Sequence, residues 1–173
     1  MEFTSSSEVK VLYVPSLAHL PEEKKARIRD WIEALRSGKF VQCKGKLSET
    51  PVDFCCLGVG CELYSQKEGG SWRKGKDGLR EFYHPNEVNV GWFSNLPPKV
   101  REWFGLFHNN GFAVQVETRF SGNLYKIEKA ALDGLNDCYG FTFSDLARLI
   151  EISLEGGFGK MIDAPVSPFS KGN

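Results

Sequence analysis

The chain has 173 residues, of which 41% are hydrophobic and 25% are charged. These values are ordinary for a soluble globular protein, and the length suits one domain with a hydrophobic core. The formal net charge is zero, with 22 basic and 22 acidic residues, so no overall positive field favours non-specific DNA binding. The sequence shows neither an apolar run long enough to span a membrane nor the pattern of a signal peptide. We therefore expect a protein of a reducing cytosol whose cysteines are free thiols.

The hydrophobic pattern predicts an α+β fold, a single compact domain with several helices around a small, mainly antiparallel sheet. This domain is expected to cover residues 9–155. Residues 1–8 are expected to form a flexible leader, and the Gly/Pro/Ser-rich residues 156–173 a loosely held tail.

The first elements follow from the spacing of apolar residues. Alternation indicates a short strand at 9–14, and apolar positions three and four apart indicate a helix that Pro21 opens and Gly38 ends. Residues 40–47 alternate as in a second strand. The side chains predicted to face inward there are Val41, Cys43 and Leu47, and those predicted to face outward are Gln42, Lys44 and Lys46.

Residues 53–63, Asp-Phe-Cys-Cys-Leu-Gly-Val-Gly-Cys-Glu-Leu, contain three of the five cysteines. Asp53 is the expected N-cap of a helix that is apolar on nearly all sides, and such a helix is normally buried. Free cysteine behaves as a small hydrophobe, so structural burial is the favoured interpretation. The spacing fits no zinc motif, because a helix points Cys61 away from the other two thiols, and no metal is expected.

The same segment leaves open a catalytic alternative. Cys55 or Cys56 would lie in the first turn of the helix, where the helix dipole lowers the pKa of a thiol. A cysteine nucleophile also needs a base, and His84 in Tyr-His-Pro-Asn is the best candidate. This alternative predicts a cysteine-dependent hydrolase.

The second half of the chain predicts further elements of both kinds. Residues 66–78 are polar and glycine-rich, as in a loop, and Pro97 precedes a helix. Residues 112–117 alternate as in a strand, and residues 124–135 are expected to be at least partly helical. Thr142 begins a capping-box pattern that opens the last helix.

Four blocks of the sequence resemble a family of small uncharacterised proteins from tailed bacteriophages and prophages. The blocks are residues 31–47 (WIEALRSGKFVQCKGKL), 53–63 (DFCCLGVGCEL), 95–106 (NLPPKVREWFGL) and 135–151, in which LND leads into FSDLARLIE. The resemblance implies a phage accessory protein that acts in the host cytoplasm, for example in counter-defence. It implies no catalytic residues and no cofactor.

A protein of this kind is expected to bind and sequester a small nucleotide-type signal without turnover. Such a binder needs cations for phosphates and aromatic faces for bases. The candidate ligand-binding residues are Lys44, Lys46, Trp72, Arg73, Lys74 and Lys76. The alternatives are the cysteine-dependent hydrolase and a regulator that binds a host protein. The expected partners are accordingly a small nucleotide-like ligand or a host protein, with no membrane, and the state of self-association is left open.

Overall fold

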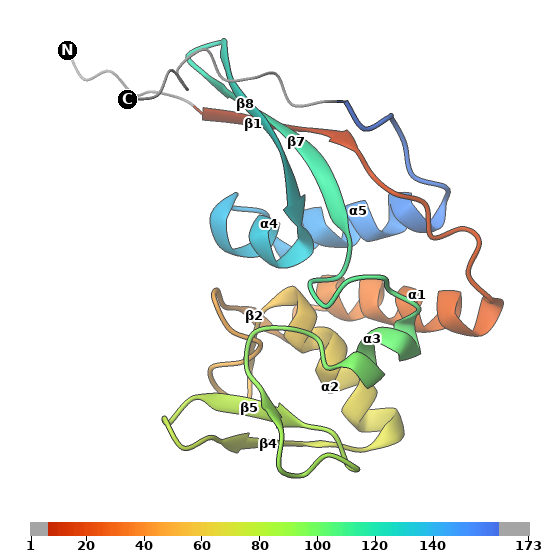
Figure 1. Ribbon diagram of the computed structural model, residues 1–173, viewed down its shortest axis with the longest axis vertical. Helices are drawn as coiled ribbons and strands as arrows, with labels where there is room; N and C mark the ends of the chain where they lie inside the picture. The colour runs from red at the N-terminus through yellow and green to blue at the C-terminus, as the bar shows by residue number, and fades with distance from the viewer. Residues whose placement is uncertain (1–6, 163–173) are drawn as a thin grey trace, which may run out of the picture.

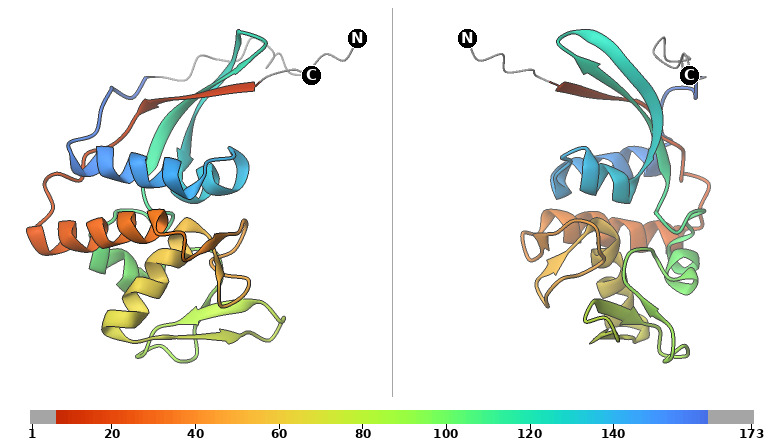
Figure 2. Two further views of the ribbon diagram at one scale, coloured as in Figure 1. Left: turned by 180° about the vertical axis from the view of Figure 1, so that it is seen from behind. Right: turned by 60° about the vertical axis from the view of Figure 1, so that its left-hand side comes forward.

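A computed structural model describes residues 7–162, which form five α-helices and eight β-strands in one α+β domain. The predicted fold class is confirmed. The structure is layered, with a three-stranded sheet at one end, helices in the middle and a β-hairpin at the other end (Figure 1). Views from behind and from the side show the same order of layers (Figure 2).

The helices are α1 (Glu22–Arg36), α2 (Cys56–Glu68), α3 (Pro98–Phe104), α4 (Leu132–Cys138) and α5 (Phe143–Leu154). The strands are β1 (Ser7–Tyr13), β2 (Val41–Gln42), β3 (Asp53–Phe54), β4 (Ser71–Lys74), β5 (Arg80–Tyr83), β6 (Gly91–Trp92), β7 (Ala113–Phe120) and β8 (Asn123–Ala131).

The strands of the described residues form three separate sheets. The largest has the order β1-β7-β8 and is antiparallel throughout, with Val11 opposite Val116 and Val116 opposite Glu128. A second antiparallel sheet has the order β4-β5-β6, and β2 pairs with β3 in a short parallel ladder. Helices α4 and α5 pack beneath the largest sheet, and α1 packs between α5 and α2 (Figure 1).

Helix α1 forms where the sequence predicts it, because its apolar residues recur at helical spacing. Ile28, Trp31, Ile32 and Leu35 are buried, and Pro21 is the N-cap. The Trp31 indole donates a hydrogen bond of 2.9 Å to the carbonyl of Cys56, which joins α1 to the start of α2. The remaining predicted helix starts are also observed: α3 begins at Pro98 and α5 begins with a capping box.

Helix α2 is the buried helix predicted at the cysteine-rich segment. Every residue from Cys56 to Cys61 is buried, as expected for a helix that is apolar on all sides. The predicted N-cap is wrong, however. Asp53 belongs to β3, and Cys55 is the N-cap, with its sulfur accepting a hydrogen bond of 3.4 Å from the amide of Gly58.

The strand predicted at 40–47 and the loop predicted at 66–78 both differ from the structure. The strand expected at 40–47 is limited to Val41–Gln42, because Gly45 turns the chain with a φ of +74°. Val41 is consequently 57% exposed rather than inward-facing. The loop expected at 66–78 does not exist as such, since α2 continues to Glu68 and β4 follows as one arm of a hairpin.

The segment 124–135, expected to be at least partly helical, is helical only in its last four residues. Strand β8 covers most of it, because β8 pairs with β7 along its whole length, and helix α4 starts only at Leu132. Tertiary pairing thus overrides a local sequence without clear periodicity.

The ends of the domain are more ordered than predicted. Ser7 and Glu8, placed in the leader by sequence, pair with β7. Val14 and Phe158 exchange backbone hydrogen bonds of 3.0 and 3.1 Å, so the start of the predicted tail is fastened beside β1. The leader at 1–6 and the tail at 163–173 lie outside the described residues.

Candidate functional site

The thiols proposed as nucleophiles lie in the hydrophobic core. Cys55 is 3% exposed and Cys56 is fully buried. Burial raises the pKa of the Cys55 thiol from 9.0 to about 12 and raises the pKa of Cys56 well above 9.0. The expectation that the helix dipole lowers these pKa values is wrong, because removal from water outweighs the dipole.

His84, the proposed base, is committed to other partners. Its Nε2 lies 2.8 Å from the hydroxyl of Tyr64, and its Nδ1 accepts a hydrogen bond of 3.1 Å from the amide of Asn86. Because Nδ1 accepts this bond, the single N–H of the neutral imidazole ring is on Nε2. That N–H points at the Tyr64 hydroxyl. The sulfur of Cys56 instead contacts the carbonyl of Leu132, at 3.6 Å. The hydrogen bonds within residues 7–162 therefore pair His84 with neither thiol.

The candidate ligand-binding residues gather around the hairpin of β4 and β5. We call the hairpin surface the face made by Trp72, Lys74 and Arg80, together with Lys76 in the turn between β4 and β5 and the neighbouring loop that carries Lys44 and Lys46. Lys74 and Arg80 are directly opposite each other in the β4–β5 ladder, so their side chains emerge from the same face. Figure 1 shows the loop between β2 and β3 above this hairpin.

Arg80 connects the two parts of the hairpin surface. Its Nε donates a hydrogen bond of 2.9 Å to the Ser48 hydroxyl on the loop. Its guanidinium lies over the Trp72 ring, 5.2 Å from the ring centroid. Arg80 is not among the residues predicted from the sequence, although Asp77-Gly78 is a turn signal. A hairpin centred on that turn places residue 80 opposite Lys74.

Trp72 is a structural anchor of the hairpin surface and not an open stacking face. Its ring packs edge-on against Phe54 and Phe82, with centroid distances of 5.5 and 5.2 Å. Its indole nitrogen donates a hydrogen bond of 2.8 Å to the Glu62 carboxylate. The prediction that Trp72 itself stacks on a base is therefore not supported by its surroundings.

Arg73 does not join the other candidates. It lies between Trp72 and Lys74 in β4, so its side chain emerges from the opposite face of the hairpin. There its guanidinium lies 3.7 Å from the centroid of the Tyr83 ring, and it donates a hydrogen bond of 2.8 Å to the carbonyl of Val88.

The lysines of the hairpin surface differ in how far their charges are neutralised. Lys46 is 3.4 Å from the Glu49 carboxylate. Lys44, Lys74 and Lys76 are exposed, and in the described part of the chain neither they nor Arg80 form an ion pair. Burial lowers the pKa of Arg80, because the charge is partly removed from water. The hairpin surface therefore holds several cations without an ion pair, and the nearby Glu62 carboxylate, which is bonded to Trp72, acts on the charge of Arg80.

A groove of about 730 Å³ lies at the other end of the molecule, between β8 and α4. Its charges balance, because Lys126 is 2.7 Å from Glu128, and Lys129 is matched in number by Asp133. The Thr118 hydroxyl on its wall is buried and has no hydrogen-bond partner among residues 7–162. The groove is polar and concave, but it offers no excess positive charge for a phosphate.

Metal sites and membrane-spanning helices were also sought among the described residues. No group of three or more His, Cys, Asp or Glu side chains is arranged to hold a metal ion within residues 7–162. None of the helices in that range has the length and apolar character needed to cross a membrane.

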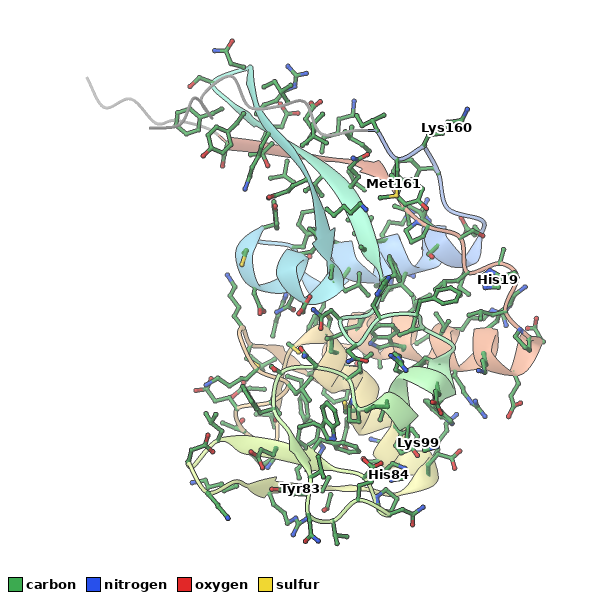
Figure 3. All side chains as sticks on the ribbon, in the orientation of Figure 1. His19, Tyr83, His84, Lys99, Lys160 and Met161 are labelled. Carbon is green, nitrogen blue, oxygen red and sulfur yellow. The ribbon has the colours of Figure 1, made fainter. Side chains whose placement is uncertain are left out.

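Figure 3 locates His84 and Tyr83 near the hairpin, and Lys160 and Met161 beside the β1-β7-β8 sheet at the opposite end.

A family model described as "Domain of unknown function (DUF8296)" matches residues 24–154. The chain belongs to this family. The matched range starts in α1 and ends in α5, so it includes the hairpin surface and the buried cysteine helix. Searches of curated proteins and of solved structures found no match.

Proposed function

We propose that the protein binds a small phosphate-bearing ligand of the nucleotide type on the hairpin surface and holds it without turnover. The observation that carries the proposal is the Lys74–Arg80 pair. Two cations directly opposite each other on one face of a ladder repel, and such pairs destabilise a sheet. An anion bound between them turns this repulsion into attraction to a common partner.

The geometry of Arg80 fits recognition of a phosphate and a base together. Its Nε is held by Ser48, and its terminal nitrogens have no hydrogen-bond partner in the described range, so they can approach phosphate oxygens as a pair. The Trp72 ring supports one face of the guanidinium. The other face is a planar cation on which a base can stack.

Binding without turnover agrees with the residues of the hairpin surface. It contains lysines, an arginine and a tryptophan, and none of these is an activated nucleophile paired with a base. The buried thiols of α2 have raised pKa values and are poor nucleophiles at neutral pH. The proposal includes a phage accessory role in the host cytoplasm, with the ligand as a signal to be sequestered. This part is supported only by the resemblance of the four sequence blocks to phage and prophage proteins.

The test is a thermal-shift and calorimetry screen against cyclic dinucleotides, cyclic oligonucleotides and ADP-ribose derivatives, with chromatography of the recovered ligand. A ligand at about 100 times its dissociation constant should add about 2.7 kcal/mol of stability. Lys74→Gln should weaken binding roughly tenfold to a hundredfold, since a hydrogen bond to a charged group contributes about 1.5–3 kcal/mol. Lys160→Gln, at the opposite end of the molecule, is the matched control and should bind normally (Figure 3).

A second readout separates a binding role from a structural one. Removing the Lys74 charge relieves the repulsion with Arg80, so Lys74→Gln should be slightly more stable than the wild type without ligand, by about 0.2–1 kcal/mol. A variant that gains stability and loses affinity is the signature of a binding site. No shift across the panel, or equal binding by Lys74→Gln, would overturn the proposal, and a cleaved ligand would favour the hydrolase.

A further inference from the structure

Strand β8 is a terminal strand of the β1-β7-β8 sheet, and its outer edge pairs with no other strand of the described residues. At nine residues it is a long edge. An unpaired edge of this length presents a row of backbone donors and acceptors to which another strand can be added. The sequence along its centre, residues 125–129, is Tyr-Lys-Ile-Glu-Lys.

We propose that β8 pairs with β8 of a second copy of the chain, antiparallel, about a two-fold axis that passes through Ile127. This joins the two three-stranded sheets into one continuous sheet of six strands. The inference is independent of the proposed function, because it concerns the opposite end of the molecule (Figure 1).

The charge pattern of residues 125–129 is what identifies a second copy as the partner. An antiparallel pairing centred on Ile127 places Lys126 opposite Glu128 of the second copy, and Glu128 opposite its Lys126. It also places Ile127 opposite Ile127, while Tyr125, the extra residue of a bulge in the β7–β8 ladder, lies outside this regularly paired stretch. The cross-strand pairs of residues 126–128 are then of a favourable kind: opposite charges and two apolar side chains.

Charges that served only to protect the edge would all have the same sign. Lysines that block edge pairing work by repelling a second copy that carries the same charge. Here Lys126 is 2.7 Å from Glu128 on the same strand, so both signs emerge from one face within two residues. A symmetric pairing extends this pair into an alternating cluster of four charges, which attracts and sets the register.

Apolar side chains are exposed at one end of this edge. Near the turn between β7 and β8, two large apolar side chains of β8 are solvent-exposed in the single chain: Leu124 at 45% and Tyr125 at 65%. An antiparallel partner places its β8 beside these residues, and burial of apolar surface favours association.

The experiment measures mass by sedimentation equilibrium and light scattering over a range of concentrations. The wild type should be a dimer that dissociates on dilution, because an interface built on one strand pair is small. Lys126→Glu and Glu128→Lys should each weaken dimerisation roughly tenfold to a hundredfold, since each converts two attractive pairs into repulsive ones. Circular dichroism establishes that each variant is folded.

Mixing the two variants gives the decisive result. Lys126→Glu carries two acids on the edge and Glu128→Lys carries two bases, so a mixture should form heterodimers at concentrations where each variant alone is monomeric. No change within one chain can produce that outcome. Lys10→Glu, on β1 at the other edge of the sheet, is the matched control and should dimerise like the wild type. A monomeric wild type, a mixture that stays monomeric, or a dimer lost in Lys10→Glu would each overturn the proposal.

Discussion

Replacing Gly58 by alanine tests how closely α2 packs against the segment that precedes it. A Cβ at position 58 would lie 1.7 Å from the carbonyl oxygen of Leu47 and 2.7 Å from its carbonyl carbon. These are backbone atoms, so no side-chain rotation can relieve the overlap, and the start of α2 must move away from residue 47. That movement also strains the hydrogen bond of 3.0 Å from the amide of Cys55 to the same carbonyl.

The expected size of the effect follows from two opposing contributions. Alanine is favoured over glycine in a helix by about 1 kcal/mol. Overpacking of a well-filled core costs about 1–3 kcal/mol and occasionally more, and an overlap with rigid backbone belongs at the upper end. We expect Gly58→Ala to lower the free energy of unfolding by roughly 2 kcal/mol. For a chain of this length that corresponds to about 4–8 °C in Tm.

The measurement is urea denaturation followed by tryptophan fluorescence, because Trp31 contacts the start of α2 through its bond to Cys56. Gly134→Ala is the matched control. Gly134 also lies in a helix, but a Cβ there meets nothing within 4 Å, so this variant should be more stable by about 0.5–1 kcal/mol. If Gly58→Ala were as stable as Gly134→Ala, the close approach of α2 to Leu47 would be refuted.

Three further predictions concern buried polar groups, thiols and a surface ion pair. Asn136 is fully buried and its side chain bonds the Cys43 carbonyl at 2.8 Å, so Asn136→Ala should cost about 1–3 kcal/mol in chemical denaturation. The exposed Asn89→Ala should cost nearly nothing, and equal losses would contradict this. Iodoacetamide should label the exposed Cys138 in the native protein and leave Cys55 unlabelled, as read by mass spectrometry; rapid labelling of Cys55 would contradict its burial. Two arginines, Arg36 and then Arg148, lower the pKa of Glu151 from 4.5 to about 2. The stability that Glu151 contributes is thus present above pH 4.5 and is lost as the pH falls towards about 2. The difference in free energy of unfolding between the wild type and Glu151→Gln should therefore shrink across that interval. A difference that is constant with pH would show that the ion pairs contribute nothing.

The helices that were predicted well are those whose signals are local. Helix α1 has an apolar stripe at helical spacing and a proline at its N-cap, and α5 has both a stripe and a capping box. Each such signal depends on residues within one or two turns of one another, so it can be identified before the partners are known. Strand β7 is predicted by the alternation at 112–117 for the same reason, because alternation is a local signal.

The elements that were mispredicted depend on partners far along the chain. Residues 124–130 include good helix formers, and only their pairing with β7 makes them a strand. Trp72 in a glycine-rich segment resembled an exposed loop residue. Its contacts with Phe54 and Phe82 instead make it an anchor of the β4–β5 hairpin.

The candidate site shows the same division. The sequence located cations and an aromatic residue between 44 and 76, but charge alone does not tell which of them are neutralised. Only the fold placed Arg73 on the far face against Tyr83 and brought the unnoticed Arg80 opposite Lys74.

The sequence by itself determined the fold class, the burial of the cysteine helix and the positions of the amphipathic helices. These follow from composition and from the spacing of apolar residues along a short stretch of chain. The tertiary structure decided which thiol caps α2, which cations remain without a partner and which strand edge stays open. Those properties depend on which segments pair and pack together in the fold, and no local pattern encodes which groups will meet.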